Sequence, residues 1–99
     1  MKKIIVLGAG RSSSALISYL IKTANTEGWH VTVGDTSITN ARERVGANPK
    51  AAAIEFNIEN TEESRKAIQN SDVVISLMPA SLHPLVAKIC LSEKKHLLT

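Results

Sequence analysis

The sequence predicts an α/β protein in which five parallel strands form one doubly wound sheet. Short apolar runs alternate with longer segments of helical spacing along all 99 residues, and this alternation is typical of strands joined by helical crossovers. The first apolar run passes directly into the turn "GAG". No internal repeat interrupts the alternation. Because crossovers between parallel strands are right-handed, we expect the strand order 3-2-1-4-5.

The expected strands are apolar runs that stop at turn-forming or charged residues. Residues 4–7 form a continuous apolar run that ends at Gly8, as expected of a strand buried on both faces. The other expected strands are residues 30–33, residues 52–56, residues 72–77 and the closing "KKHLLT". We expect this last strand to be an exposed edge, whose pairing with a second copy would give a homodimer.

Helical spacing follows each of the first four strands. Leu16, Leu20 and Ala24 lie four residues apart and define the expected buried stripe of the first helix. The second helix is expected from about residue 37 until Gly46 ends it.

The third and fourth helices are predicted mainly from residues at their starts. Thr61 is the expected N-cap of the third helix, because acidic residues follow it in the first turn. The fourth helix is expected to begin near Ser81, with Pro84 in its first turn. Cys90 lies on the apolar stripe of this helix and is expected in the core.

Composition excludes several classes of function. The chain is long enough for one domain, residues 1–99, and its formal charge of +3 is dispersed rather than gathered in a basic block. With 3% aromatic residues it offers no base-stacking platform, so we expect no nucleic-acid partner. No run is long enough to span a membrane, and one cysteine permits neither an internal disulfide nor a thiolate metal cluster. We expect a cytoplasmic protein that binds no metal.

Gly8, Gly10 and Ser13 occupy the three special positions of a G-x-G-x-x-G turn between a strand and a helix. The first glycine permits the tight turn, the second admits a pyrophosphate, and the third residue must be small so that the helix packs on the strand. Serine is small enough for this position. We therefore expect free N–H groups around Arg11, Ser12 and Ser13 to face the phosphates of a dinucleotide. The alternative is a turn that uses glycine for its shape alone.

Asp35 follows the second strand, 22 positions after Ser13, where the acidic residue that binds the ribose hydroxyls is expected. A carboxylate there repels a 2′-phosphate, so it favours NAD over NADP. Thr36 is expected to contact the same part of the cofactor. Against the preference for NAD, the hydroxyls of Thr36 and Ser37 could donate to a phosphate. Arg42 and Arg44 are further candidates for a 2′-phosphate, and Asp35 alternatively caps the next helix.

Two later segments are expected at the same edge of the sheet. Asn57 and Ile58 follow the third strand, where an amide and an apolar side chain suit an adenine ring. The alternative is a strand-ending asparagine and a core isoleucine. Leu77, Met78 and Pro79, in the segment "SLMPAS", are expected to line the nicotinamide ribose. His83 lies beside this segment and is either catalytic or a partly exposed structural histidine.

Three segments make the chain similar to the nucleotide-binding portion of the saccharopine dehydrogenase family: "KKIIVLGAGRSSSALISYL", "WHVTVGDTS" and "SDVVISLMPASLHPLVAKICLSEKKHLLT". The last is the most specific. The resemblance implies a Rossmann-like domain of a nicotinamide-dependent oxidoreductase of lysine metabolism, which interconverts saccharopine with its precursors by hydride transfer at a carbon–nitrogen bond. NADP-using relatives tend to carry a basic residue after the second strand, where this chain has "GDTS".

The resemblance also implies that the substrate domain and the catalytic residues lie beyond Thr99. On this interpretation the chain is the first part of a longer protein, which takes an amino-acid substrate, and the fragment alone binds the dinucleotide without catalysis. An alternative from another class is a regulatory module that senses NAD(H) in a transporter, since fold alone does not separate the two.

Overall fold

The computed structural model describes residues 2–10 and 13–98. It contains one parallel sheet in the order β3-β2-β1-β4-β5, which confirms the predicted topology. The strands are β1 (Lys3–Leu7), β2 (His30–Asp35), β3 (Ala51–Glu55), β4 (Val73–Ser76) and β5 (His96–Leu98). All predicted strands are present, with ends shifted by a few residues at most, as is usual where local propensity alone sets a boundary.

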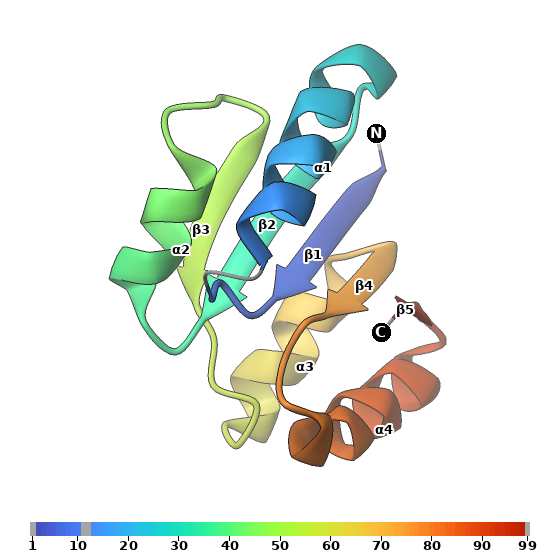
Figure 1. Cartoon of the computed structure of the whole chain (residues 1–99). Coiled ribbons are helices and arrows are strands. Elements are labelled where there is room, and N and C mark those ends of the chain that lie inside the picture. The colour runs from blue at the N-terminus through green and yellow to red at the C-terminus, as the bar shows by residue number, and fades with distance from the viewer. Residues whose placement is uncertain (1, 11–12, 99) are drawn as a thin grey trace.

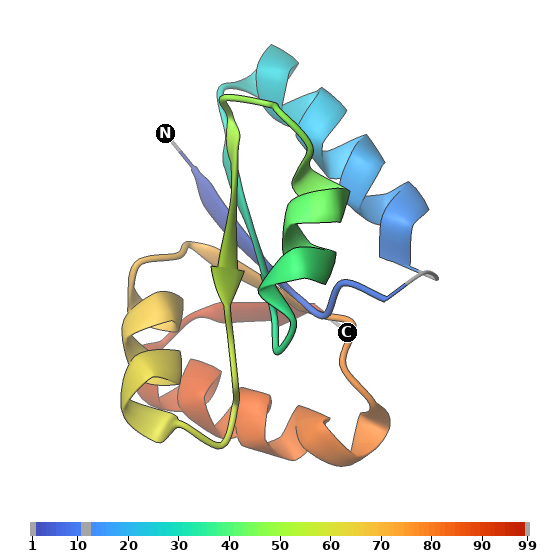
Figure 2. The ribbon, with the colours of Figure 1, turned by 90° about the vertical axis from the view of Figure 1, so that its left-hand side faces the viewer.

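Four α-helices and one short 3-10 helix connect the strands. They are α1 (Ser14–Glu27), α2 (Ile38–Val45), α3 (Thr61–Gln69), η2 (Ala80–Leu82) and α4 (His83–Glu93). Figure 1 shows α1 and α2 against one face of the sheet and α3 and α4 against the other, and the view in Figure 2 shows the sheet between these two layers. The chain is therefore doubly wound, as the sequence predicts.

The strand residues alternate between two hydrophobic clusters, one on each face of the sheet. Val6 of β1 packs with Ile17 in the cluster beneath α1 and α2, whereas its neighbour Ile5 packs with Ile68 in the cluster beneath α3 and α4. Each of these four side chains is at most 1% exposed. Cys90 lies in the second cluster, as predicted, and its burial raises the pKa of the thiol.

The buried stripe of α1 differs from the predicted one. Leu20 and Ala24 are buried as expected, together with Ile17 and Ile21, but Leu16 is 37% exposed. The side of α1 that faces the sheet is therefore centred one position later than the four-residue spacing suggested. Leu16 lies in the first turn of α1, where it lines a small cavity instead of the core.

Two helix starts also differ from the prediction. The N-cap of α3 is Asn60, not Thr61, because the Asn60 side chain accepts a hydrogen bond from the N–H of Glu63. The fourth helix begins at His83 rather than near Ser81, because η2 forms a separate tight turn before it. A side-chain cap therefore decides the start of α3, whereas α4 has no side-chain cap and begins where the 3-10 turn ends.

Candidate dinucleotide-binding site

The carboxyl ends of β1, β2 and β4 meet because the three strands are paired in parallel. Leu7 of β1 lies opposite Gly34 on one side and Ser76 on the other. A cavity of about 380 Å³ lies at this edge, which is where ligands bind to open parallel sheets. It is lined by Gly8, Ala9, Gly10, Gly34, Asp35, Thr36, Phe56, Leu77, Met78, Pro79 and Leu82.

Seven of the residues predicted to contact a cofactor line this one cavity. They are Gly8, Gly10, Asp35, Thr36, Leu77, Met78 and Pro79. These residues come from three separate segments of the sequence, which follow β1, β2 and β4. The fold therefore brings the glycine-rich turn, the acidic residue and the proline-containing segment together.

The two glycines of the turn meet different requirements. Gly8 has φ +108°, and a Cβ there would lie 3.1 Å from the backbone carbonyl of Leu77. Its own N–H donates to the Gly34 carbonyl at 2.7 Å, which fixes the turn against β2. Gly10 is exposed, and a Cβ there would meet nothing within 4 Å. Gly8 therefore shapes the turn, whereas Gly10 leaves its backbone open to a ligand.

Ser13 closes the turn onto Gly10. Its hydroxyl donates to the Gly10 carbonyl at 2.6 Å, and its N–H donates to the same oxygen at 3.1 Å. The Nε of Arg44 approaches this oxygen at 3.4 Å. Ser13 is 5% exposed, so it is as tightly packed as a small third residue should be. Its N–H is not the free donor that the sequence predicted, and Arg11 and Ser12 lie outside the described residues.

Asp35 links the end of β2 to both neighbouring turns. Its Oδ1 accepts a hydrogen bond from the N–H of Ala9 at 3.0 Å, and its Oδ2 accepts one from the N–H of Ser37 at 2.9 Å. The Ser37 hydroxyl in turn caps α2 by accepting from Asn40. In the part of the chain that the structure describes, no cationic side chain forms an ion pair with Asp35. The carboxylate therefore stabilises the loop and still borders the cavity.

Asn57 and Ile58 are not among the lining residues. The Asn57 side chain accepts from the N–H of Glu59, which makes it part of the turn before α3, and Ile58 is 4% exposed in the core beneath α3 and α4. Phe56 lines the cavity instead, because Gly34 allows it to approach. A Cβ on Gly34 would lie 2.9 Å from the Phe56 Cβ. The signal in the sequence was the glycine itself, which follows three β-branched residues within β2 and marks a place where another side chain can approach the backbone.

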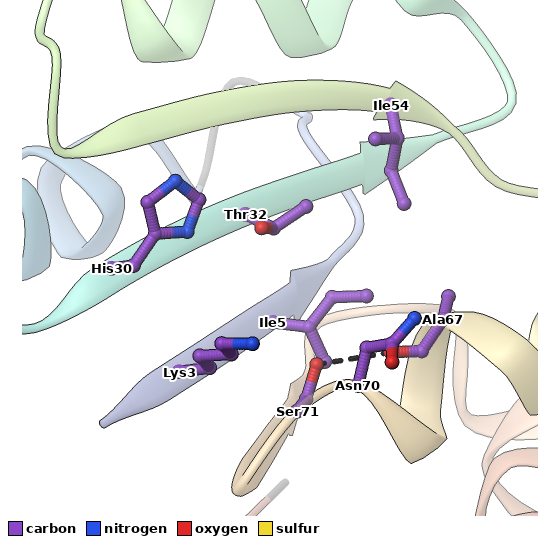
Figure 3. A pocket seen from close by; sticks show the side chains of 8 residues that line it. All are labelled: Lys3, Ile5, His30, Thr32, Ile54, Ala67, Asn70 and Ser71. Carbon is purple, nitrogen blue, oxygen red and sulfur yellow. Dashed lines mark hydrogen bonds between the residues drawn. The ribbon is translucent and has the colours of Figure 1, made fainter. Parts of the chain in front are cut away.

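Further cavities include one of about 310 Å³ between α1 and the end of α2, and two more. Of these two, one of about 190 Å³ adjoins the cavity at the carboxyl edge and shares Leu77 and Met78 with it. The other, of about 360 Å³, is shown in Figure 3 and lies over the starts of β1 and β2. It is lined by Lys3, Ile5, His30, Thr32, Ile54, Ala67, Asn70 and Ser71, none of which the sequence predicted to bind a cofactor.

The model of one protein family, described as the saccharopine dehydrogenase NADP binding domain, matches residues 4–99 of the chain. The chain belongs to this family. Membership agrees with the resemblance found in the sequence and with the cavity at the carboxyl edge. The domain binds a nicotinamide dinucleotide, although the expected preference for NAD finds no support in the family description, which names NADP. No helix in the described ranges is long and apolar enough to cross a membrane.

Individual relatives match nearly the whole chain. The mitochondrial alpha-aminoadipic semialdehyde synthase of Bos taurus is 34% identical over 99% of this chain. The saccharopine dehydrogenase [NADP(+), L-glutamate-forming] of Saccharomyces cerevisiae is 30% identical over 99%. The chain spans 10% of the length of the first relative and 21% of the second.

Solved structures agree with this assignment. The apo saccharopine dehydrogenase (L-Glu forming) from Saccharomyces cerevisiae superimposes with a TM-score of 0.84 and 28% identity, over 98% of this chain and 21% of that chain. A short-chain dehydrogenase/reductase from Veillonella parvula in complex with NADP superimposes with a TM-score of 0.71 at 20% identity, which shows the shared fold alone.

Proposed function

We propose that the chain is the dinucleotide-binding domain of an oxidoreductase that transfers hydride at a carbon–nitrogen bond of a saccharopine-type amino acid. The cavity formed by the glycine-rich turn, Asp35 and the segment after β4 carries the proposal. Family membership supports the reaction class, and both relatives described above bear enzyme names. On this proposal residues 1–99 are one domain, and the catalytic residues and the substrate site belong to further chain.

The residues of the turn fit a dinucleotide. A volume of about 380 Å³ lies within the range of roughly 300–1,000 Å³ that is usual for small-molecule sites. Gly8 and Gly10 present backbone rather than side chains at the place where a pyrophosphate approaches the turn. When bound, the nicotinamide ring donates or accepts the hydride, and the protein binds, orients and shields the cofactor. Leu77, Met78 and Pro79 would contact its nicotinamide half.

The adenosine half would lie beside Asp35 and Thr36, and we propose a preference for NAD(H). The Asp35 carboxylate has no ion-pair partner in the described part of the chain, and its two hydrogen bonds to N–H groups leave it able to accept from ribose hydroxyls. A 2′-phosphate would meet this charge, and Arg44, whose Nε approaches the Gly10 carbonyl at 3.4 Å, does not pair with Asp35. The family description and the yeast relative's name point instead to NADP.

Parallel titrations with NADH and NADPH test the proposal. We expect binding of both, with NADH tighter by about tenfold, which corresponds to about 1.4 kcal/mol. Equal or tighter binding of NADPH would overturn the NAD preference, whereas the absence of binding by either would overturn the dinucleotide site itself. Gly10→Val should weaken the binding of both dinucleotides, because its side chain would fill the approach to the turn. Ala87→Val adds the same side chain at an exposed position and is the control.

Four other predictions from the sequence concern the class of protein, its compartment, its substrate and its oligomeric state. Nothing in the comparisons supports the alternative of an NAD(H)-sensing module in a transporter. The cytoplasmic compartment, the amino-acid substrate and the homodimer remain predictions, with β5 as the expected dimer edge because it pairs only with β4 in the described sheet.

A further inference from the structure

The smaller cavity beside the dinucleotide cavity is lined by two residues that each carry a buried polar atom without a hydrogen-bond partner in the described part of the chain. It measures about 190 Å³ and is lined by Ser13, Leu16, Ser76, Leu77, Met78 and His83. The Oγ of Ser76 and the Nε2 of His83 are both buried, and neither has a partner within the described ranges. Ser76 is 1% exposed. Because buried polar atoms are nearly always paired, two unpaired ones on residues that line one cavity make a polar group of a ligand a candidate partner for both.

The cavity adjoins the larger one at the segment that follows β4. Leu77 and Met78 line both cavities. Ser76 is the last residue of β4 and His83 the first of α4, so the two residues bracket this segment. A ligand in the larger cavity that extends past Leu77 and Met78 would enter the smaller one.

The size of the cavity excludes a whole substrate. Complete small-molecule sites usually exceed roughly 300 Å³, while one water occupies roughly 30 Å³. A volume of about 190 Å³ fits one ring with a small substituent.

The chemistry of the lining selects an uncharged polar substituent. None of the described lining residues carries a carboxylate, an ammonium or a guanidinium group. The Ser13 hydroxyl already donates to Gly10, which leaves Ser76 and His83 as the unpaired groups. A hydroxyl both donates and accepts, and a neutral imidazole nitrogen does one or the other. A primary carboxamide offers an N–H donor and a carbonyl acceptor, so it satisfies both side chains.

Apolar side chains provide surfaces for the ring. Leu16 is 37% exposed and lines the cavity, although its position in the helical pattern predicted burial. Met78 lines the same cavity and is partly buried. A ring bound against these side chains would remove apolar surface from water.

We propose that Ser76 and His83 bind the carboxamide of the nicotinamide and thereby orient its ring against Leu16 and Met78. This inference rests on the proposed function, because it assumes that a dinucleotide occupies the larger cavity. It assigns both residues a positioning role, since they hold the substituent rather than the carbon that exchanges hydride.

The test compares two ligands that differ only in the nicotinamide end. One is whichever of NADH and NADPH binds more tightly, and the other is ADP-ribose, or its 2′-phosphate when NADPH is the tighter ligand. Ser76→Ala and His83→Leu should each weaken dinucleotide binding by about five- to tenfold, as expected for one lost hydrogen bond. Binding of the nicotinamide-free ligand should stay within about twofold. His83→Gln should retain most of the affinity, because its amide nitrogen can replace Nε2.

Exposed residues of the same types give matched controls. Ser92→Ala and His96→Leu should change the affinity for neither ligand. If Ser76→Ala and His83→Leu weaken both ligands equally, or neither, the two residues have a structural role and the inference is wrong. If the unaltered protein binds the nicotinamide-free ligand and the variants show no selective loss, the proposed function survives without this inference. Failure of the unaltered protein to bind either ligand overturns both.

Discussion

The Asp35 Oδ1 accepts a hydrogen bond from the backbone N–H of Ala9 at 3.0 Å, across 26 positions of the sequence. Ala9 is 1% exposed, so this N–H has no access to water. The bond therefore connects the residue expected to select the cofactor with the turn expected to hold its pyrophosphate. Changes at Asp35 should affect both stability and cofactor choice.

Asp35→Asn should lower stability and shift binding toward NADPH. The amide retains one acceptor oxygen for two N–H donors, so one donor is left unpaired, at a cost of about 1–3 kcal/mol. Loss of the negative charge should raise the affinity for NADPH relative to NADH severalfold. Thermal unfolding and paired titrations measure the two effects. Glu43→Gln removes a charge from exposed helix surface and is the control. An unchanged ratio of the two affinities would show that Asp35 acts only in the loop.

Gly34→Ala and Gly10→Ala should separate packing from binding. The added Cβ at Gly34 would lie 2.9 Å from Phe56, and such overpacking costs about 1–3 kcal/mol. Gly10→Ala meets no neighbour within 4 Å, so the free energy of unfolding should change little, while dinucleotide binding should weaken because the methyl group narrows the approach to the turn. Chemical denaturation and titration of both variants provide the comparison. If the two substitutions lower the free energy of unfolding equally, the proposed separation of a packing role for Gly34 from a binding role for Gly10 is wrong.

Ser13 should tolerate alanine but not leucine. Ser13→Ala removes the hydrogen bond from the hydroxyl to the Gly10 carbonyl, which still accepts from the Ser13 N–H. The expected loss of stability is about 1 kcal/mol. Ser13→Leu places a large side chain at a position that is 5% exposed, so both stability and dinucleotide binding should fall markedly. Ser18→Leu on the exposed side of α1 is the control. A leucine variant with normal binding would show that this turn does not require a small third residue.

Asp72 should contribute stability that is lost in acid. Its Oδ2 accepts from the backbone N–H of Lys3 at 2.7 Å, and this bond, followed by smaller effects of nearby lysines, holds the pKa of the carboxyl below its ordinary value although desolvation opposes the shift. A carboxyl whose pKa is lower in the folded state stabilises the protein above its unfolded pKa of about 3.9 and loses that contribution as the pH falls through the folded pKa. The free energy of unfolding, measured from pH 6 down into the acid range, should therefore change less with pH in Asp72→Asn than in the unaltered protein. If the free energy of unfolding falls equally with pH in the unaltered protein and in Asp72→Asn, Asp72 does not make this contribution.

Much of the site could be predicted from the sequence because its signals are local. The apolar run before Gly8 and the spacing from the glycines to Asp35 predict a strand, a turn and an acidic residue at one edge of a parallel sheet. The apolar run before Leu77 adds a third segment to that edge. The structure brings these segments to one cavity because the carboxyl ends of parallel strands lie together.

Other features of the site depend on contacts between distant segments. The approach of Phe56 to Gly34 and the hydrogen bond from Ala9 to Asp35 follow from strand register and loop geometry. The hydrogen bond from the Ser13 N–H to the Gly10 carbonyl is local, and the geometry of the turn decides it. The spacing of residues along the sequence predicts none of these three contacts. The same limit applies to Leu16, whose four-residue spacing predicted a core position but whose place in the first turn leaves it at a cavity.

The sequence by itself determined the order of the elements, the sheet topology and which segments meet at the cavity at the carboxyl edge, since hydrophobic period and glycine positions act locally. Only the tertiary structure decided which polar atoms are left without partners. The sequence placed Ser76 in the segment "SLMPAS" expected beside the nicotinamide ribose and left His83 with two interpretations. Burial without a hydrogen-bond partner makes these two side chains in particular candidates for ligand contact. Burial and pairing depend on every neighbouring segment at once, and for that reason no local pattern predicts them.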